Sequence, residues 1–324
     1  MDNRHYKRRS IRNAKARRRR RRRKLLLTVA AVSLILLCTI TVFKRLYPLL
    51  SEGKSSPLSA LSVNLDKLYS PCAILIDPGT GKIIAGHNSE EKMYPASLTK
   101  LMTALLAVEQ TDDLDDIITL SSDFFQGLHE ADASLAGFEP GEDVRLKDLL
   151  YGVLLPSGAE CCLAFSHIIA GSEEEFVKLM NKKAKELGMN HTHFCNSTGL
   201  HNDDHYSTVG DIAVLLKYAL KNNIFREAFT SSRYSTLPSL CHPDGFTFYS
   251  TLSENMSGAE VIGGEILGGK TGYTQEAGLC LASLARVNGK EYILVTAGAD
   301  GDHDTEQFHI SDAVNVYNQL GASS

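Results

Sequence analysis

Ser97 and Lys100 are the first residues in the sequence whose types and spacing could do chemistry. They lie three positions apart at the start of a predicted helix, so one helical turn brings both side chains to the same face. A lysine kept near neutral by surroundings of low polarity can take the proton of a serine hydroxyl and make the serine a nucleophile. The spacing alone is a weak signal, because Ser51 and Lys54 share it in a segment without a predicted element.

Two further segments offer polar groups that would complement such a pair. Lys270, Thr271 and Gly272 come just before the last predicted strands, where an edge strand would present its backbone and a cation to a substrate lying alongside it, although an ordinary turn would use similar residues. Ser157 lies in a turn between two predicted helices, where capping of the second helix is the simplest role for an exposed serine.

Two strand pairs are predicted to position these groups. Residues 72–77 and 82–85 are apolar runs that flank a turn containing Pro and Gly. Residues 278–285 and 291–297 flank Asn288-Gly289, which is the strongest short-range signal for a hairpin.

The sequence between these strand pairs has helical periodicity. We expect helices at residues 98–109, 146–155, 160–170, 173–187 and 209–222, and a last amphipathic helix at residues 311–320. Strands at both ends with helices between them predict an α+β fold, in which an antiparallel sheet closes where the chain ends meet and is flanked by helices, with an additional all-helical region.

The N-terminal part of the chain has a segregated charge. Residues 1–24 contain fourteen Lys and Arg against one acidic residue, whereas the whole chain has a formal charge of −4. Residues 25–43 contain no charged side chain, and a helix of this length would span roughly 28 Å, close to the hydrocarbon thickness of a bilayer. The sequence therefore predicts a basic cytoplasmic tail at residues 1–24 and a transmembrane anchor at residues 25–47.

The anchor sets the expected location of the remaining chain. Residues 48–66 are rich in Ser and are predicted to be a tether, and residues 67–324 form one catalytic domain outside the cell membrane. A nucleic-acid-binding arm and a cleaved signal peptide are the alternatives. The apolar run disfavours the first, and its length, above the roughly 7 to 15 residues of a signal peptide, disfavours the second.

Cysteine and histidine could suggest metal binding or disulfides. The seven cysteines have no metal-like spacing, and we expect Cys72 and Cys280 to be unpaired core thiols, with a cross-strand disulfide as the alternative. Four histidines are clustered in the sequence, and no carboxylate lies at ligand spacing on a helix beside them, so no metal is expected there: His191, His193, His201 and His205.

Taken together in chain order, these segments resemble the penicillin-binding protein and serine beta-lactamase superfamily, and more closely the low-molecular-weight D-alanyl-D-alanine carboxypeptidases. The resemblance extends from about Cys72 to Ala299 and includes the strand pair before the nucleophile. The motifs that carry it are residues 94–104, 140–142, 196–200, 205–208 and 270–278.

The resemblance implies a role for each candidate residue. Ser97 would be the nucleophile and Lys100 its base, and Ser157 would belong to the proton path to the leaving D-alanine. Lys270 and Thr271 would hold the substrate carboxylate, beside Gly272. The backbone N–H groups of Ser97 and Tyr273 would form the oxyanion hole.

The same resemblance implies the substrate and the partners. The reaction would remove the terminal D-alanine of peptidoglycan stem pentapeptides through an acyl-enzyme, and beta-lactams would be covalent inhibitors. No metal or organic cofactor, and no nucleic acid, would take part.

The sequence departs from the family pattern at several places. Ala159 stands where the second motif usually has Asn, so Glu160 or a water would have to replace the missing amide. His303 is the one basic residue in the segment where the family often has an arginine, and the β-rich domain that many relatives carry downstream is expected to be absent.

Two other functions are compatible with parts of this pattern. A beta-lactamase would need a deacylating carboxylate, and Glu186 has the required spacing to Asn190, although it lies at a predicted helix end. An idle peptidoglycan-binding or beta-lactam-binding module is supported by Ala159 alone.

Overall fold

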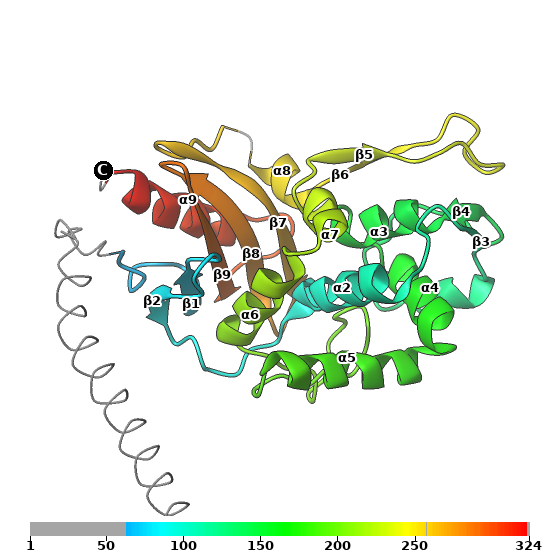
Figure 1. The fold of residues 1–324 in the computed structure, drawn as a ribbon, viewed down its shortest axis with the longest axis horizontal. Helices are drawn as coiled ribbons and strands as arrows, with labels where there is room; N and C mark the ends of the chain where they lie inside the picture. Colours follow the sequence, from blue (N-terminus) through cyan, green and yellow to red (C-terminus); the bar gives the residue numbers. More distant parts are fainter. Residues whose placement is uncertain (1–62, 257, 323–324) are drawn as a thin grey trace, which may run out of the picture. The chain divides into compact units, whose positions relative to one another are not determined.

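The computed structural model describes residues 63–256 and 258–322. Five strands form its central antiparallel sheet: β1 (Cys72–Ile76), β2 (Ile83–His87), β7 (Gly264–Thr274), β8 (Gly278–Val287) and β9 (Lys290–Ala299). Their order across the sheet is β2-β1-β9-β8-β7 (Figure 1). Both predicted hairpins are confirmed, and β1 pairs with β9 through contacts such as Ile74 opposite Val295, so the two ends of the domain meet in the sheet as expected.

The burial of β8 explains why its sequence reads as a continuous apolar run. Cys280, Ala282 and Leu284 contribute to the core on the helical side of the sheet, whereas Leu281 and Ala285 contribute to a second core on the opposite side. Because successive side chains of a strand point to opposite faces, a strand covered on both faces is apolar at nearly every position.

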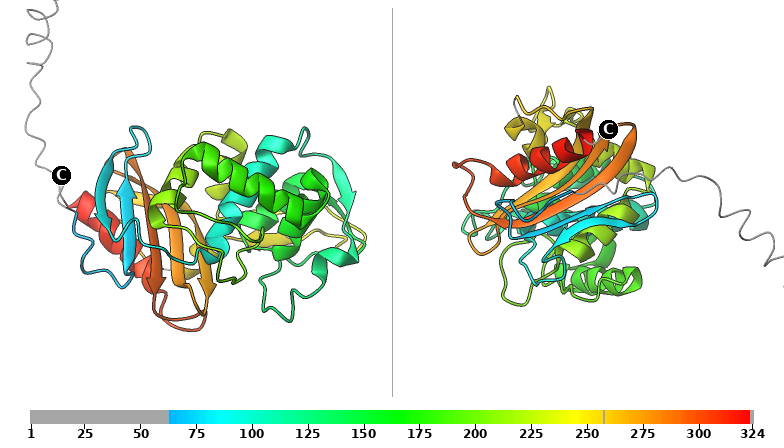
Figure 2. Two further views of the ribbon diagram at one scale, coloured as in Figure 1. Left: turned by 90° about the horizontal axis from the view of Figure 1, so that it is seen from below. Right: turned by 90° about the vertical axis from the view of Figure 1, so that its left-hand side faces the viewer.

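Helices cover both faces of this sheet (Figures 1 and 2). The predicted helices are confirmed with small changes of bounds: α2 (Lys100–Gln110), α3 (Leu146–Leu154), α4 (Ala159–Ala170), α5 (Glu173–Leu187), α6 (Val209–Ala219) and α9 (Phe308–Gly321). Helix α9 lies against β8 and β9 on one face, and α6 lies against β9 and β1 on the other. One expectation is corrected in detail, since residues 96–99 form a 3₁₀ turn before α2 rather than its first α-helical turn.

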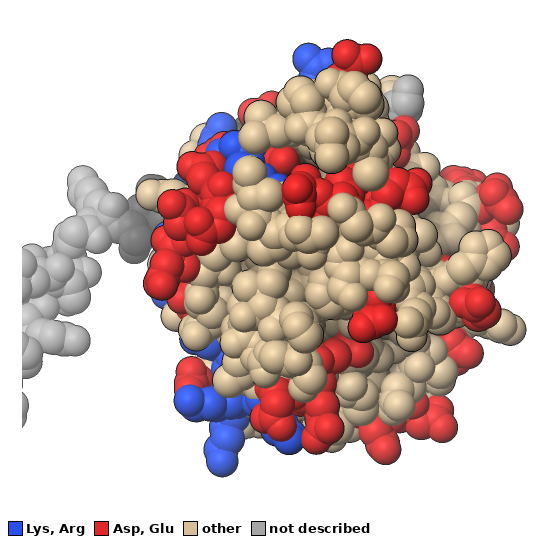
Figure 3. Space-filling view, turned by 90° about the vertical axis from the view of Figure 1, so that its right-hand side faces the viewer, with Lys and Arg blue, Asp and Glu red and all other residues tan. Residues whose placement is uncertain are grey.

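Several short elements of the helical region were not predicted. They are β3 (Ile117–Thr119), β4 (Asp143–Arg145), β5 (Arg233–Ser235), β6 (Thr247–Tyr249), α7 (Asn223–Phe229) and α8 (Thr251–Asn255). Each is too short for an apolar period to emerge from the sequence. The hairpin of β5 and β6 extends along the outer side of the helical region (Figure 1). Most of the face at this end of the molecule is uncharged, and its charged side chains are mainly acidic, with a few Lys and Arg near the margin (Figure 3).

The predicted tail and anchor, residues 1–47, and most of the tether lie outside the described residues. Within residues 63–256 and 258–322, no helix has the length and apolar character needed to cross a membrane.

Candidate active site

Ser97 and Lys100 meet as their spacing predicts. Ser97 lies in the 3₁₀ turn, directly after Ala96, whose φ of 44° is unusual for a residue with a side chain. Lys100 is the first residue of α2, and its Nζ donates hydrogen bonds to Ser97 Oγ at 3.0 Å and to the carbonyl oxygen of Thr198 at 2.7 Å. The 3₁₀ turn and the Thr198 carbonyl therefore hold the amine against the hydroxyl.

The pKa values of two buried lysines are lowered in this site. Burial lowers the pKa of Lys100, since desolvation disfavours the ammonium ion. Lys270 is fully buried, and burial, followed by the charge of Lys100, lowers the pKa of Lys270 well below its usual range. Lys270 Nζ donates to the carbonyl oxygen of Thr271 at 2.8 Å. A base for a serine hydroxyl needs a lowered pKa of this kind.

Ser157 lies in the same site but does not behave as an exposed capping serine. The residue is 4% exposed, and Gly158, without a side-chain cap, precedes the first residue of α4. Ser157 has a φ of 70°, in the left-handed region, and its buried Oγ has no hydrogen-bond partner among the described residues. Strained backbone and an unsatisfied hydroxyl are costly, and such features concentrate at functional sites.

Strand β7 forms one side of the site. It is the edge strand of the sheet, as predicted, and Thr271, Gly272 and Tyr273 all face the site. A Cβ atom built at Gly272 would lie 3.0 Å from the backbone nitrogen of Ser97, so a glycine lets the strand approach the nucleophile closely. Thr271 Oγ1 also forms a 2.6 Å hydrogen bond with Thr251 Oγ1 of α8.

Residues 196–200 form part of the opposite side. A carboxylate oxygen of Glu173 accepts hydrogen bonds from the backbone nitrogen and Oγ of Ser197, at 2.8 and 2.6 Å. Asn196 Oδ1 accepts from the nitrogen of Gly199 at 2.7 Å. Gly199 has a φ of 84°, and a Cβ built there would lie only 1.9 Å from the Ala96 carbonyl oxygen. Only glycine fits this position without moving the turn that carries Ser97.

These segments enclose a cavity of about 470 Å³. The predicted residues Ser97, Lys100 and Ser157 line it together with Thr271, Gly272 and Tyr273, whereas Lys270 is buried behind the wall. The cavity also contains lining residues that the sequence did not single out for the site: Asp132, Ser134, His201, Thr251, Asn255 and His309. His309 lies in the first turn of α9, and the others lie in loops, turns or the short α8. None belongs to a motif, so no signal in the sequence identified them.

Ala159 and Glu160 occupy the position of the second motif. Ala159 lines the cavity and has no polar side-chain group. Glu160 Oε1 accepts hydrogen bonds from the backbone nitrogens of Ala136 and Gly137, at 2.6 and 3.1 Å. Oε1 is thus engaged by a neighbouring loop, whereas Oε2 has no hydrogen-bond partner among the described residues. That Glu160 replaces the missing amide beside Lys100 stays a prediction.

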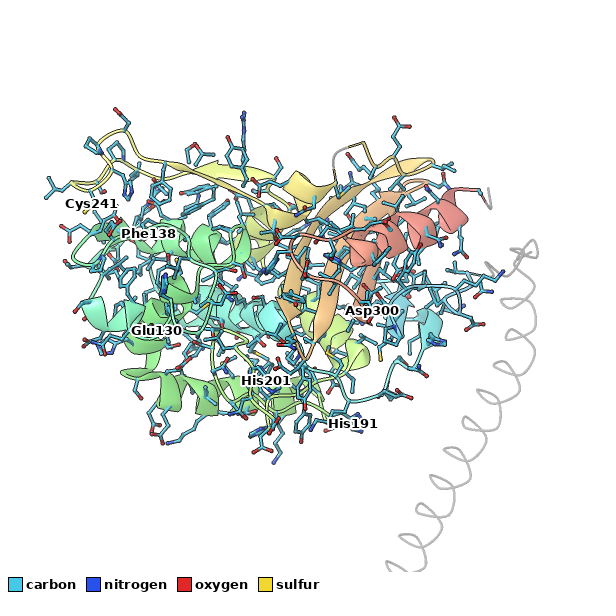
Figure 4. The ribbon with its side chains drawn as sticks, turned by 180° about the vertical axis from the view of Figure 1, so that it is seen from behind. Glu130, Phe138, His191, His201, Cys241 and Asp300 are labelled. Atoms are coloured by element: carbon cyan, nitrogen blue, oxygen red, sulfur yellow. The ribbon has the colours of Figure 1, made fainter. Side chains whose placement is uncertain are left out.

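Among the clustered histidines, His205 has structural partners. His205 Nε2 and Thr99 Oγ1 are 2.9 Å apart, and His205 Nδ1 accepts from the backbone nitrogen of Cys195 at 3.2 Å. Figure 4 places His201 beside the junction of the sheet and the helical region. No group of three or more potential metal ligands occurs among the residues that the structure describes. Cys72 and Cys280 are free thiols, as expected.

Glu186 does not approach the cavity lining. It lies near the end of α5 and pairs with Lys182 at 3.9 Å and with Lys183 at 3.6 Å. The carboxylate that the beta-lactamase hypothesis requires therefore has a surface role in this structure.

The fold and the site together define a class: an α+β protein in which a strained turn presents a serine to a buried lysine beside an edge strand. Residues 59–301 match the family model described as D-alanyl-D-alanine carboxypeptidase, and the chain belongs to this family.

Individual relatives agree with this assignment. The chain is 38% identical over 233 residues to the D-alanyl-D-alanine carboxypeptidase DacF of Bacillus subtilis, which covers 70% of this chain and 57% of the relative. It is 32% identical over 235 residues to DacC of Escherichia coli, with 71% and 56% covered. The match thus spans little more than half the length of these relatives. The Streptomyces K15 DD-transpeptidase structure superposes with a TM-score of 0.71 at 26% identity, covering 80% of this chain and 100% of that chain.

Proposed function

We propose that this protein is a serine D,D-carboxypeptidase that removes the terminal D-alanine from peptidoglycan stem pentapeptides. The observation that carries the proposal is the 3.0 Å hydrogen bond from Lys100 Nζ to Ser97 Oγ inside a cavity bordered by edge strand β7. Such a pair satisfies the distance for proton transfer, and the buried position of Lys100 lowers its pKa toward the range a base needs.

In the proposed acylation step, the substrate peptide lies along β7. Ser97 Oγ attacks the carbonyl carbon of the penultimate D-alanine, and its proton passes to neutral Lys100. The backbone N–H groups of Ser97 and Tyr273 would stabilise the negative oxygen of the tetrahedral intermediate. The bond between carbon and nitrogen then breaks, and the proton held by Lys100 passes by way of Ser157 to the leaving D-alanine amine, which returns Lys100 to its neutral form.

In the deacylation step, Lys100 takes a proton from water, whose oxygen attacks the ester carbonyl of the acyl-enzyme. The ester bond to Ser97 breaks, the serine recovers its proton, and the shortened peptide leaves with a new carboxylate. Lys270 and Thr271 are proposed to bind the carboxylate of the terminal D-alanine before the reaction. Lys270 acts from behind the wall as a buried positive group, and Thr271 from the cavity surface.

The test uses the full-length chain and a Ser97→Ala variant. Each is incubated with fluorescent penicillin, and D-alanine release is measured from diacetyl-Lys-D-Ala-D-Ala. We expect covalent labelling and D-alanine release by the first protein and neither by the second. Labelling without D-alanine release would replace the carboxypeptidase by a penicillin-binding module, and no labelling would remove Ser97 as the nucleophile.

The likeness to the Streptomyces K15 DD-transpeptidase supports a second candidate function, transfer of the acyl group to an amine instead of water. The same assay distinguishes the two when glycylglycine is added. Two products are compared: the peptide joined to glycylglycine and the hydrolysed peptide. More of the first than of the second would favour transpeptidation.

We also propose that residues 25–47 anchor the protein in the cell membrane, with residues 1–24 in the cytoplasm and the catalytic domain outside. The uncharged run and the basic tail before it support this orientation. Protease added to intact cells should degrade the catalytic domain and leave an epitope fused to the N-terminus protected. Protection of both parts would contradict the proposed orientation.

A further inference from the structure

Glu160 is a buried carboxylate in the first turn of α4 with only one of its two oxygens satisfied. Its side chain is completely buried, and Oε1 takes the two backbone N–H groups of Ala136 and Gly137. Oε2 has no hydrogen-bond partner among the described residues. A buried carboxylate with an unsatisfied oxygen is costly, so its retention next to Ser157 requires a compensating interaction.

The two engaged N–H groups belong to the loop that forms one wall of the cavity, residues 131–137. The loop is also joined to α4 by a 2.8 Å bond from the backbone nitrogen of Ala159 to the carbonyl oxygen of Ser134. A Cβ built at Gly158 would lie 2.7 Å from the Ala136 Cβ and 3.0 Å from Glu160 Oε2. Glu160 Oε2 thus lies close to Gly158, the residue after Ser157, and the loop packs against Gly158 and is bonded to Glu160.

Lys100 is placed near this carboxylate by the fold: it lines the cavity together with Ser157 and Ala159, and α2, which begins at Lys100, packs against α4. Burial is the main cause that raises the pKa of Glu160, and the backbone N–H groups and the charge of Lys100 oppose that rise. The interaction is reciprocal: burial lowers the pKa of Lys100, and the charge of Glu160 opposes this effect.

The other titratable groups that face Lys100 cannot supply this negative charge. From α4 they are Cys161 and Cys162, and from β7 it is Lys270. Burial raises the pKa of Cys161 well above its usual range and that of Cys162 to about 12, so both thiols are neutral under working conditions. Lys270 is a cation when protonated and acts in the opposite direction.

We propose that Glu160 is a positioning residue of this site: its carboxylate fixes the loop 131–137 against α4 and supplies the negative charge that tunes the protonation of Lys100. The proposal rests on the proposed function in one respect, because it concerns the base of that reaction. This role of Glu160 does not depend on replacing the Asn side chain that is missing at Ala159.

The substitution Glu160→Gln tests the electrostatic part. An amide oxygen still accepts from Ala136 and Gly137, so the loop keeps its attachment, but the negative charge is gone. Lys100 then loses its proton more easily, and the acidic limb of the pH profile for penicillin acylation should move to lower pH by roughly one unit, the order of effect of a nearby opposite charge. An unshifted acidic limb in a folded variant would overturn the proposal.

Glu142→Gln is the matched control. Glu142 is also a buried carboxylate that accepts a backbone N–H, from Glu139 at 2.9 Å, but its other partners are Ser239 and His242 of the segment between β5 and β6. Figure 4 shows Cys241 of that segment at the outer end of the helical region, away from His201. The pH profile for penicillin acylation by Glu142→Gln should match that of the unmodified protein. If its acidic limb moved as far as that of Glu160→Gln, the effect of Glu160 would be a general effect of buried charge.

A measurement without acylation separates this inference from the proposed function. The side-chain signals of isotope-labelled lysine are titrated by NMR in the full-length chain, and Lys100 is assigned with a Lys100→Arg variant. The titration midpoint of Lys100 should fall in Glu160→Gln by the same roughly one unit. An unchanged midpoint would reject the role of Glu160 even if Ser97 is acylated. Failure of acylation with a shifted midpoint would reject only the proposed reaction.

Discussion

The two sides of the cavity are held in position by different kinds of interaction. On the sheet side, β7 pairs with β8 from Gly264 opposite Val287 to Thr274 opposite Gly278, so a ladder of backbone hydrogen bonds places Thr271 and Tyr273. On the loop side, residues 196–200 and 131–137 have no ladder. Single side chains, including Glu173, Asn196 and Glu160, place their backbones through individual hydrogen bonds.

This difference indicates how each side should respond to mutation. A ladder shares the positional constraint among many backbone bonds, so a changed side chain alters local chemistry and leaves the register in place. A loop held by a few side chains loses about 0.5 to 1.5 kcal/mol for each neutral hydrogen bond removed, and more for a charged partner. The loop side should therefore be the more sensitive of the two.

The largest effect should come from removing the reacting atom while both sides stay in place. Ser97→Ala removes Oγ but leaves Lys100 bonded to the Thr198 carbonyl. We expect penicillin acylation to fall by at least about 10³-fold, as for the loss of a catalytic nucleophile, with little change in Tm. Stopped-flow acylation and calorimetry check both parts. A large fall in Tm would mean that Ser97 also supports the walls.

A paired glycine substitution compares the two sides directly. In Gly199→Ala the new Cβ would meet the Ala96 carbonyl oxygen at 1.9 Å with φ at 84°, so the loop or the turn that carries Ser97 must move. We expect a loss of about 3 kcal/mol in the free energy of unfolding, from overpacking together with backbone strain, and acylation slowed by about 100-fold.

Gly272→Ala is its counterpart on the sheet side. The new Cβ would lie 3.0 Å from the Ser97 nitrogen, which a small shift relieves, and the ladder resists larger movement. Its cost should be about 1 kcal/mol, at the low end for an inserted methyl group. Urea denaturation of both variants measures the difference, and equal losses would show that the two sides are equally rigid.

Acid should lower the free energy of unfolding through His205, which accepts a hydrogen bond from Cys195 beside residues 196–200. Burial, followed by the charges of His193 and His201, lowers the pKa of His205 from its ordinary value of 6.5 to about 4. Between these values the unfolded chain binds the proton and the folded protein does not, so stability falls as the pH falls. The slope is up to about 1.4 kcal/mol per pH unit. Protonation at Nδ1 would also remove the acceptor of the Cys195 N–H group.

Denaturation curves recorded between about pH 7 and pH 4.5 measure this slope. The pKa of His309 in α9 is also lowered to about 4, by burial and then by His303, so the slope has contributions from two histidines. His205→Gln should therefore reduce the slope by about half. If the slope were the same in His205→Gln as in the unmodified protein, His205 would bind its proton equally well in the folded and the unfolded protein.

The smallest effect should come from the turn of the sheet itself. Gly289 has a φ of 75°, and no atom lies within 4 Å of a Cβ built there. Gly289→Ala should cost about 1 kcal/mol from backbone strain without changing the acylation rate, because the turn lies at the end of the ladder away from the site. A slower acylation would show that the register of β8 and β9 depends on this turn.

Sequence reasoning succeeded where structure is local or repeats along the chain. Asn288-Gly289 specified a hairpin because both residues tolerate positive φ, observed at 50° and 75°. The spacing of Ser97 and Lys100 specified their contact because one turn of helix joins them. For Ser157 the residue type alone favoured an exposed cap, and only the resemblance assigned it to the site, because its burial depends on the loop 131–137 packing over Gly158.

The sequence by itself determined the contact between Ser97 and Lys100 and the order of the main elements, since each depends on short spacing or on apolar periodicity. Tertiary structure alone decided what surrounds the pair. It brought the Thr198 carbonyl to Lys100 across 98 positions and Thr251 to Thr271 across 20, and it turned Glu160 toward the loop. Such contacts depend on how separate segments pack, and packing leaves no periodic signal in the sequence.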